Sequence, residues 1–334
     1  MLTIKKMAQR TLQFLVVFSF SCFSVVLAAY PDRPITIVSP FSAGGDADLA
    51  ARSFAQAASK ALGQSVVVLN KPGASGVLGS SQVISAQPDG YTLLLGRTGS
   101  QAILPAIMPT NTRYNWDNYT FIGLLEVNPY GCVVSAKSSY QNFEDLAQEI
   151  KKRGKTLNYG TAGRLTTNDM GPRKLFSLLK VSPQNVPTQI PYKGTGEAVI
   201  SLMAGQTQFS CGSLGSFLTH IKAGELRALM VTSDKRLDQF PEVPTARELG
   251  YDEMETIVGW SAVLAPPNLP QEIQAALARA MQNIGKDQQW QSLTARTGSI
   301  PRITSGHETK IFIGKQYELY RSLGEELDII DNPN

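Results

Sequence analysis

The sequence predicts an α/β protein built from two lobes. Three observations lead to this expectation. Short β-branched runs alternate with segments whose apolar residues recur at helical spacing. The alternation begins again near residue 131, after a first complete series of strands and helices. About 300 residues remain beyond an N-terminal export segment, which is long enough for two lobes with separate cores.

The first series begins with a strand and a long helix. The helix is predicted over Asp46 to Leu62, because its apolar residues lie on one face and Gly63 follows as a stop. Turn sequences such as Pro88-Asp89-Gly90 separate the later segments. An alternation of this kind favours a parallel sheet flanked by helices. The predicted strands of this half are Ile35–Ser39, Val66–Leu69 and Tyr91–Leu95.

The second series repeats the pattern and ends in two helices. An amphipathic helix is predicted from Pro270, which is a favourable first-turn residue, and a last helix from about Glu308 to Leu327. Pro129 and the pair Pro266-Pro267 are the places where the chain is expected to pass between lobes. The predicted strands are Gly131–Ser135, Leu157–Gly160, Ile190–Tyr192, Gln208–Cys211 and Leu226–Thr232.

Residues 1–29 have the pattern of a secretory signal peptide. Lys5, Lys6 and Arg10 precede an apolar run from Leu12 to Leu27, and the small residues at 28 and 29 follow it. The alternative is a membrane anchor, but the run is short for a span of about 20 apolar residues. We therefore expect export to the periplasm, with cleavage near Ala28/Ala29.

The charge balance gives no reason to expect a nucleic-acid partner. The chain has 31 basic and 27 acidic residues, and three of the basic ones lie in the export segment. The remainder, 28 against 27, is almost neutral. A neutral chain lacks the basic surface that binds nucleic acid or an anionic membrane.

Two cysteines, Cys132 and Cys211, follow the export segment. In an oxidising compartment they are candidates for a disulfide. The alternative is a pair of buried free thiols. Neither lies in a CxxC motif, so the sequence shows no redox or metal-binding cysteine pattern.

Three loops share one layout, in which a strand leads into small residues and then into a helix start. They are Pro40 to Asp46, Tyr159 to Asn168, and Tyr192-Lys193-Gly194-Thr195-Gly196. Loops at the carboxyl ends of parallel strands are where ligands bind, and helix N-termini favour anions. Each loop is therefore a candidate carboxylate cradle. The alternative is ordinary turn chemistry, with Asp46 and Asp48 acting only as caps.

The motifs of catalysis and of cofactor binding are absent from the sequence. It contains no GxSxG, no HExxH, no P-loop ending in Gly-Lys-Ser/Thr, and no GxGxxG after a strand. Its two histidines, His220 and His307, have no cysteine or histidine at metal-ligand spacing. We therefore expect no enzymatic activity, no metal and no cofactor.

Several segments together resemble the Bug-type proteins, the extracytoplasmic solute receptors of tripartite tricarboxylate transporters. The similar blocks occur in family order and span nearly the whole chain after the export segment. They are Tyr30 to Asp46, Asn70 to Gly76 with Pro88 to Leu94, Pro191 to Gly194 with Leu202 to Gln206, Leu226 to Ser233, and Pro241 to Thr245 with Glu248 to Gly250.

The resemblance implies a type II periplasmic binding-protein fold with two α/β lobes, a ligand cleft and two crossovers. Residues 30–129 and 255–334 would form one lobe, and residues 130–254 the other. The expected function is capture of a small carboxylate by lobe closure and its delivery to integral membrane transporter subunits, with the receptor a monomer. The ligand-binding residues expected from the loops and the resemblance are Phe41, Ser42, Ala43, Gly44, Gly45, Asp46, Asp48, Arg97, Thr98, Ser100, Gly160, Thr161, Ala162, Gly163, Arg164, Thr166, Thr167, Asn168, Tyr192 and Ser213.

The second loop departs from the family pattern. Leu165 stands where the family usually has glycine, Asp169 where it has histidine, and the stretch after Cys211 lacks a common acidic residue. Two arginines are candidates for binding the second carboxylate of a diacid. Arg164 lies in this loop, and Arg97 lies at the end of a predicted strand. Phe41 would suit an aromatic acid instead.

Other functions stay open at this point. The chain could serve a signalling partner as a ligand sensor, since transport and sensing both depend on lobe closure. It could receive a neutral amide or a vitamin-like ring. A periplasmic enzyme on the same two-lobed fold is the alternative outside the binding proteins.

Overall fold

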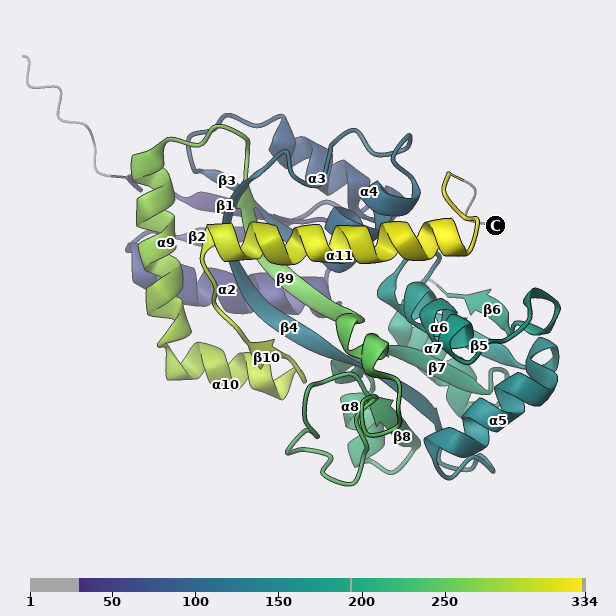
Figure 1. Cartoon of the computed structure of the whole chain (residues 1–334). Coiled ribbons are helices and arrows are strands. Elements are labelled where there is room, and N and C mark those ends of the chain that lie inside the picture. Colours follow the sequence, from purple (N-terminus) through teal and green to yellow (C-terminus); the bar gives the residue numbers. More distant parts are fainter. Residues whose placement is uncertain (1–29, 193, 332–334) are drawn as a thin grey trace, which may run out of the picture.

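The computed structural model describes residues 30–192 and 194–331, and the predicted export signal lies outside them. Helices and strands alternate along the chain (Figure 1). The strands are β1 Ile35–Ser39, β2 Val66–Asn70, β3 Thr92–Arg97, β4 Thr120–Ser135, β5 Asn158–Thr161, β6 Thr188–Pro191, β7 Phe209–Ser213, β8 Leu226–Val231, β9 Val258–Ala265 and β10 Ile300–Pro301. The α-helices are α2 Asp46–Leu62, α3 Val77–Ile84, α4 Leu104–Ile107, α5 Phe143–Arg153, α6 Thr167–Leu178, α7 Thr195–Met203, α8 Leu218–Lys222, α9 Gln271–Gly285, α10 Gln288–Arg296 and α11 Gly306–Glu326.

The first lobe is a mixed sheet with the strand order β2-β1-β3-β9-β4, and β10 pairs with the far side of β4. β1 runs parallel to β2 and β3, whereas β9 and β4 are antiparallel to their neighbours. The helices α2, α3, α4, α9, α10 and α11 surround this sheet (Figure 1).

The second lobe contains β5, β6, β7, β8 and the last residues of β4. β7 and β8 both pair with β4 in antiparallel register, and β5 lies parallel to β6 and β7. The long strand β4 therefore joins both sheets: its residues up to Pro129 pair with β9, and its residues from Tyr130 pair with β7. The predicted parallel sheet is correct for β1–β3 and for β5–β7 and wrong for the central strands.

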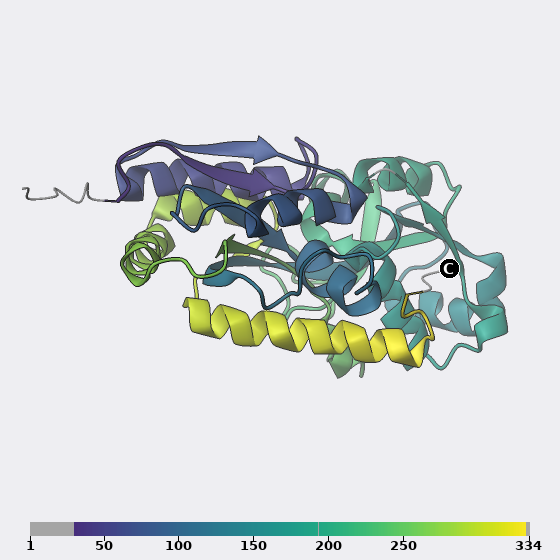
Figure 2. The same cartoon turned by 90° about the horizontal axis from the view of Figure 1, so that it is seen from above.

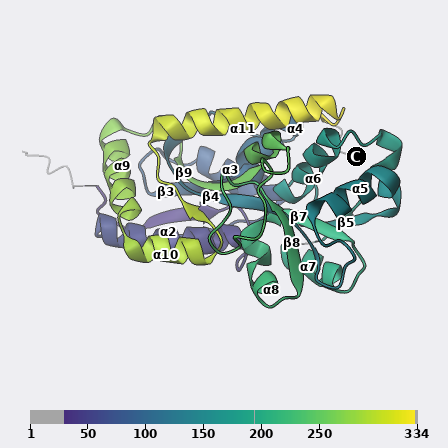
Figure 3. The same ribbon diagram turned by 60° about the horizontal axis from the view of Figure 1, so that its bottom comes forward.

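The two faces of the first sheet are covered by different helices (Figures 2 and 3). Ile35, Ile37 and Leu93 point to the side of α2 and α9, whereas Val38 and Leu94 point to the side of α11. This division follows from the two-residue period of a strand, which places neighbouring side chains on opposite faces. Burial on both faces explains why these strands are continuous apolar runs.

The hydroxyl of Thr232 ties the two crossover segments together. Its Oγ1 accepts a hydrogen bond from the amide of Tyr130 at 3.0 Å and donates to the carbonyl oxygen of Ile257 at 2.9 Å. The second passage between the sheets thus lies between β8 and β9. The pair Pro266-Pro267 was a wrong expectation for it, because β9 already pairs with β3 and β4 before the prolines.

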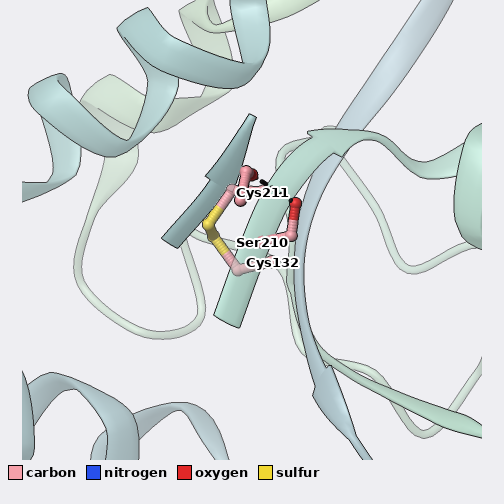
Figure 4. Close-up of a disulfide and its surroundings, with 4 residues drawn as sticks. Cys132, Ser210 and Cys211 are labelled. Atoms are coloured by element: carbon pink, nitrogen blue, oxygen red, sulfur yellow. Dashed lines mark hydrogen bonds between the residues drawn. A yellow bond between two sulfur atoms is a disulfide. The ribbon is translucent and has the colours of Figure 1, made fainter. Parts of the chain in front are cut away.

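Cys132 and Cys211 form a disulfide (Figure 4). They are directly opposite each other on β4 and β7, with their Cα atoms 4.1 Å apart, and both are fully buried. The bond fixes β7 of the second lobe to β4, the strand that continues from the first lobe. Among residues 30–192 and 194–331, no helix has the length and apolarity that crossing a bilayer requires.

Candidate functional site

A cavity of about 560 Å³ lies between the two lobes. This volume is in the range of ligand sites, which is roughly 300–1,000 Å³. Thirteen of the expected ligand-binding residues line it, and they come from both lobes. They are Phe41, Ser42, Ala43, Gly44, Gly45, Asp46, Arg97, Thr98, Ala162, Thr166, Thr167, Asn168 and Ser213.

Three helices begin at this cleft without a side-chain cap. Their N-cap residues are Gly45 before α2, Thr166 before α6 and Gly194 before α7, and none of these side chains bonds the first turn. Among the other described α-helices, Asn142, Asp287 and Ser305 cap α5, α10 and α11, whereas α3, α4, α8 and α9 also have no side-chain cap. First-turn amides that lack a protein acceptor, together with the helix dipoles, favour an anion in the cleft.

Asp48 holds the first loop in place from behind the cavity. Its carboxylate accepts hydrogen bonds from the Gly44 amide at 2.9 Å, Arg52 Nε at 2.9 Å and Asn70 Nδ2 at 3.0 Å. Burial raises the pKa of Asp48, but these hydrogen bonds outweigh it and hold the pKa below its usual range. Asp48 is thus a buried anion that fixes the loop, which fits the capping alternative better than direct ligand contact.

Asp169 does the same for the second loop. Its carboxylate accepts hydrogen bonds from the Leu165 amide at 3.0 Å and from Arg173 Nε at 2.8 Å, and its side chain is fully buried. The spacing matches the first loop: an amide four residues before the aspartate and an arginine four residues after it. Leu165 has a φ of +53°, in the left-handed region that glycine adopts freely. Burial of the leucine side chain, which is 6% exposed, offsets this backbone cost.

Arg97 is the cation among the described residues that line the cleft. Its Nη1 donates to Ser261 Oγ at 2.5 Å and lies 3.6 Å from the carboxylate of Glu126. Burial raises the pKa of Glu126, and the positive charge of Arg97 opposes that shift. The side chain of Arg97 is 12% exposed, and that remainder faces the cavity. A ligand carboxylate there would share Arg97 with Glu126.

Asn168 brings an unused donor to the cleft. The residue is 7% exposed, and its Nδ2 has no hydrogen-bond partner among the described residues. The backbone of Gly212 packs against this amide so closely that a Cβ at position 212 would lie 2.2 Å from Nδ2. A buried N–H without an acceptor is costly, so this amide suits a ligand oxygen.

Asp46 and Ser216 meet across the cleft. Ser216 Oγ of the second lobe donates a hydrogen bond of 2.9 Å to Asp46 Oδ2, in the first turn of α2. Asp46 carries the carboxylate among the described residues of the cavity lining, so it would repel an anionic ligand placed beside it.

The remaining expected residues do not line the cavity. Asp48 lies behind it. Ser100 is fully buried and donates to the Arg97 carbonyl oxygen, Thr161 accepts from Gln189 Nε2, and the hydroxyl of Tyr192 bonds Ser201 Oγ. Gly160, Gly163 and Arg164 are also absent from the lining, and Lys193 lies outside the described residues.

The cavity lining also includes residues that are not among the expected ligand-binding residues. Gly194, Thr195 and Gly196 belong to the third predicted loop, of which Tyr192 was expected to reach the ligand. Gly259 and Ser216 could not be anticipated, because β9 and the 3₁₀ helix Leu214–Phe217 had not been predicted. The additional lining residues are Ala47, Gly99, Gly194, Thr195, Gly196, Ser216 and Gly259.

Within residues 30–192 and 194–331, no group of three histidine, cysteine or acidic side chains is placed to hold a metal.

Comparisons with known protein families, sequences and structures all point to the same receptor family. The model described as "Tripartite tricarboxylate transporter family receptor" matches residues 50–329. Protein BugT of Bordetella pertussis is 31% identical over 303 residues, which cover 89% of this chain and 90% of BugT. That family consists of solute-binding receptors and not of enzymes.

Solved structures show the same fold. The periplasmic binding protein BugD is 30% identical, with a TM-score of 0.79 over 90% of this chain and 99% of its own. A protein of R. palustris with adipate is 26% identical, with a TM-score of 0.81 over 90% of this chain and 99% of its own. MatC from Rhodopseudomonas palustris, with bound malate, is 26% identical, with a TM-score of 0.77 over 88% of this chain and 99% of its own.

Proposed function

The chain belongs to the tripartite tricarboxylate transporter family of receptors, and we propose that it captures a small dicarboxylate in the cleft and delivers it to the membrane subunits of such a transporter. The observation that carries the ligand class is the Asn168 amide, a buried donor without an acceptor, beside three uncapped helix starts. Two of the structural relatives carry malate or adipate, both of which are diacids.

The assignment of two carboxylates follows from the separation of the donor groups. Asn168 and the start of α6 belong to the second lobe, whereas Arg97 is the last residue of β3 in the first. A diacid would place one carboxylate at each lobe and would therefore stabilise the form in which the lobes approach. Binding that favours one arrangement shifts the population toward it. The protein would act in the periplasm as a monomer.

Phe41 supports a second ligand class on the same wall. It lines the cavity beside the Ser42–Gly45 loop and is half-buried. An aromatic carboxylate could place its ring against Phe41 and its carboxylate at the helix starts. This ligand would not need Arg97, which makes the two classes distinguishable.

The test compares adipate with hexanoate, its monoacid analogue of equal length, by calorimetry. We expect wild type to prefer adipate and Arg97→Ala to lose about tenfold of that preference, because one charge-assisted hydrogen bond is removed. Arg164→Ala is the matched control, since Arg164 does not line the cavity, and should keep the preference. If neither variant loses it, the dicarboxylate assignment to Arg97 is wrong. Benzoate binding that survives Arg97→Ala would favour the aromatic class.

A further inference from the structure

A second cavity lies on the opposite face of the crossover strands. Its volume is about 610 Å³, and we call it the hinge pocket. The strand register fixes the two faces: Glu126 pairs with Ser261 and Asn128 with Gly259 on the cleft side. The pairs that alternate with these along the strands are Val127 with Trp260 and Pro129 with Val258. Their side chains therefore point to the opposite face, where the second cavity lies. There α11 crosses the two strands (Figure 1).

The walls of the hinge pocket come from both crossovers between the lobes and from α11. Pro129 belongs to the first crossover, Thr232 and the 3₁₀ helix Asp252–Thr256 to the second, and Phe312 to α11. Gln316 Nε2 of α11 donates to the Thr256 carbonyl oxygen at 2.9 Å, which ties this helix to the second crossover. A rotation of one lobe against the other must therefore change the shape of the pocket.

Two buried acceptors in the lining have no hydrogen-bond partner among the described residues. They are Gln316 Oε1, on a residue that is 5% exposed, and Glu255 Oε1. The bond from Gln316 Nε2 to Thr256 fixes which end of that amide is the acceptor. Arg247 bonds the other oxygen of Glu255. Buried acceptors are normally hydrogen-bonded, so a donor such as an ammonium group would satisfy both oxygens.

The charges of the lining are divided between its walls. The acidic residues Asp234 and Glu255 lie in the segment of the second crossover. The basic residues lie opposite: Arg302 directly follows β10, and Lys315 belongs to α11. The apolar part consists of Phe312 and Leu319 with the strand residues. A molecule that satisfies all three features has an ammonium group, a carboxylate and an apolar body.

We propose that the hinge pocket is a second binding site, which takes an apolar α-amino acid as a zwitterion. Its ammonium group donates to Gln316 Oε1 and Glu255, its carboxylate faces Lys315, and its side chain lies against Phe312. The pocket is open in the form in which Asp46 and Ser216 touch across the cleft. Occupancy therefore stabilises that form and strengthens ligand binding in the cleft, and linkage makes the effect reciprocal.

The first test uses L-phenylalanine, with 3-phenylpropionate and 2-phenylethylamine as analogues that lack the amine or the carboxylate. We expect wild type to bind L-phenylalanine more tightly than either analogue, measured by calorimetry at millimolar concentrations. Gln316→Leu and Lys315→Ala should each weaken binding by about tenfold. Lys315 is exposed, so its variant keeps the test valid if Gln316→Leu fails to fold. Arg97→Ala should leave phenylalanine binding unchanged.

The outcomes separate this site from the cleft. No binding of L-phenylalanine, or equal binding by wild type and both pocket variants, would mean a water-filled pocket only and would overturn the proposal. Loss of phenylalanine binding in Arg97→Ala would assign it to the cleft and would also overturn it. The coupling rests on the proposed cleft function and is read separately, as a rise in adipate affinity on adding phenylalanine. A failure of adipate to bind would refute the cleft ligand and leave the phenylalanine result standing.

Discussion

Ser216 of the second lobe donates a hydrogen bond to Asp46 of the first lobe, with 2.9 Å between the two oxygens. The two residues are 170 positions apart in sequence and line the same cavity. This bond joins the two lobes across the cleft, so it requires an arrangement in which α2 and the 3₁₀ helix Leu214–Phe217 lie close together.

We expect Ser216→Ala to speed the release of adipate by about two- to fivefold, because an exposed hydrogen bond contributes roughly 0.5–1 kcal/mol. Asp46→Asn should behave differently. The asparagine oxygen still accepts from Ser216, while the negative charge beside the ligand disappears, so adipate affinity should rise. Stopped-flow release and calorimetry measure the two effects. Equal weakening by both variants would show that the charge of Asp46 is not near the bound carboxylates.

Gly215 controls how closely the lobes approach. A Cβ on this residue would lie 2.0 Å from the carbonyl oxygen of Thr297, which is in the first lobe. We expect Gly215→Ala to fold but to hold the lobes apart, with adipate affinity reduced about tenfold or more, because overpacking of this kind typically costs about 1–3 kcal/mol. Calorimetry gives the affinity, and the unfolding temperature without ligand is the control. Unchanged affinity would show that this contact is absent from the ligand-bound form.

Glu126→Gln should increase the stabilisation that adipate provides. The variant keeps an acceptor for Ser261 and removes the negative charge that faces Arg97. The variant leaves the charge of Arg97 without a carboxylate beside it, and it also removes the burial cost that raises the pKa of Glu126. A ligand carboxylate would then supply the missing charge. Thermal unfolding with and without adipate tests this, and an adipate shift equal to that of wild type would contradict it.

Asp48 should make stability depend on pH. Its folded pKa lies below its usual range, so its contribution is present above the unfolded pKa of about 4 and is lost as the pH falls through the folded value. We expect Asp48→Asn to be less stable than wild type at neutral pH, by on the order of 1 kcal/mol for the lost charge-assisted bonds. The difference should shrink in acid. Asp117→Asn, at an exposed position, is the control for a change of charge alone.

Removal of the disulfide should destabilise the second lobe. Cys132 and Cys211 close a loop with a sequence separation of 79, and cross-links of this size stabilise by about 2–4 kcal/mol through the unfolded chain. We expect the double variant Cys132→Ala/Cys211→Ala to unfold at lower urea concentration than wild type. A reductant should lower the stability of wild type toward that of the variant and leave the variant unchanged. A reductant effect on the variant would mean that the loss has another cause.

Local patterns in the sequence predicted most elements well. β1 and α2 have the bounds that hydrophobic periodicity and Gly63 indicated, and the other predicted strands in the parallel parts of the sheets differ by one or two residues at their ends. The family blocks predicted the fold, and the receptor family is confirmed. These successes depend on information contained in short segments.

The central strands were missed because they carry no such local signal. β9 is an almost fully buried run of small and apolar residues, and β4 extends eleven residues further toward the N-terminus than its predicted part. Both lie between other strands and are covered on two faces, so neither shows the alternation of a half-buried strand. Missing them also concealed Gly259 and the antiparallel centre of the sheet.

Local sequence patterns were sufficient to predict which loops carry the helix starts, that Arg97 lies at the end of a strand, and which two cysteines are available to pair. These are properties of neighbouring residues, set by spacing, turn chemistry and burial. Which of these residues come into contact depends on the tertiary structure. Arg97 comes to lie over Glu126, Asp46 beside Ser216, and Arg164 outside the cavity, because register across β3, β9 and β4 and the approach of two lobes bring together residues far apart in the chain.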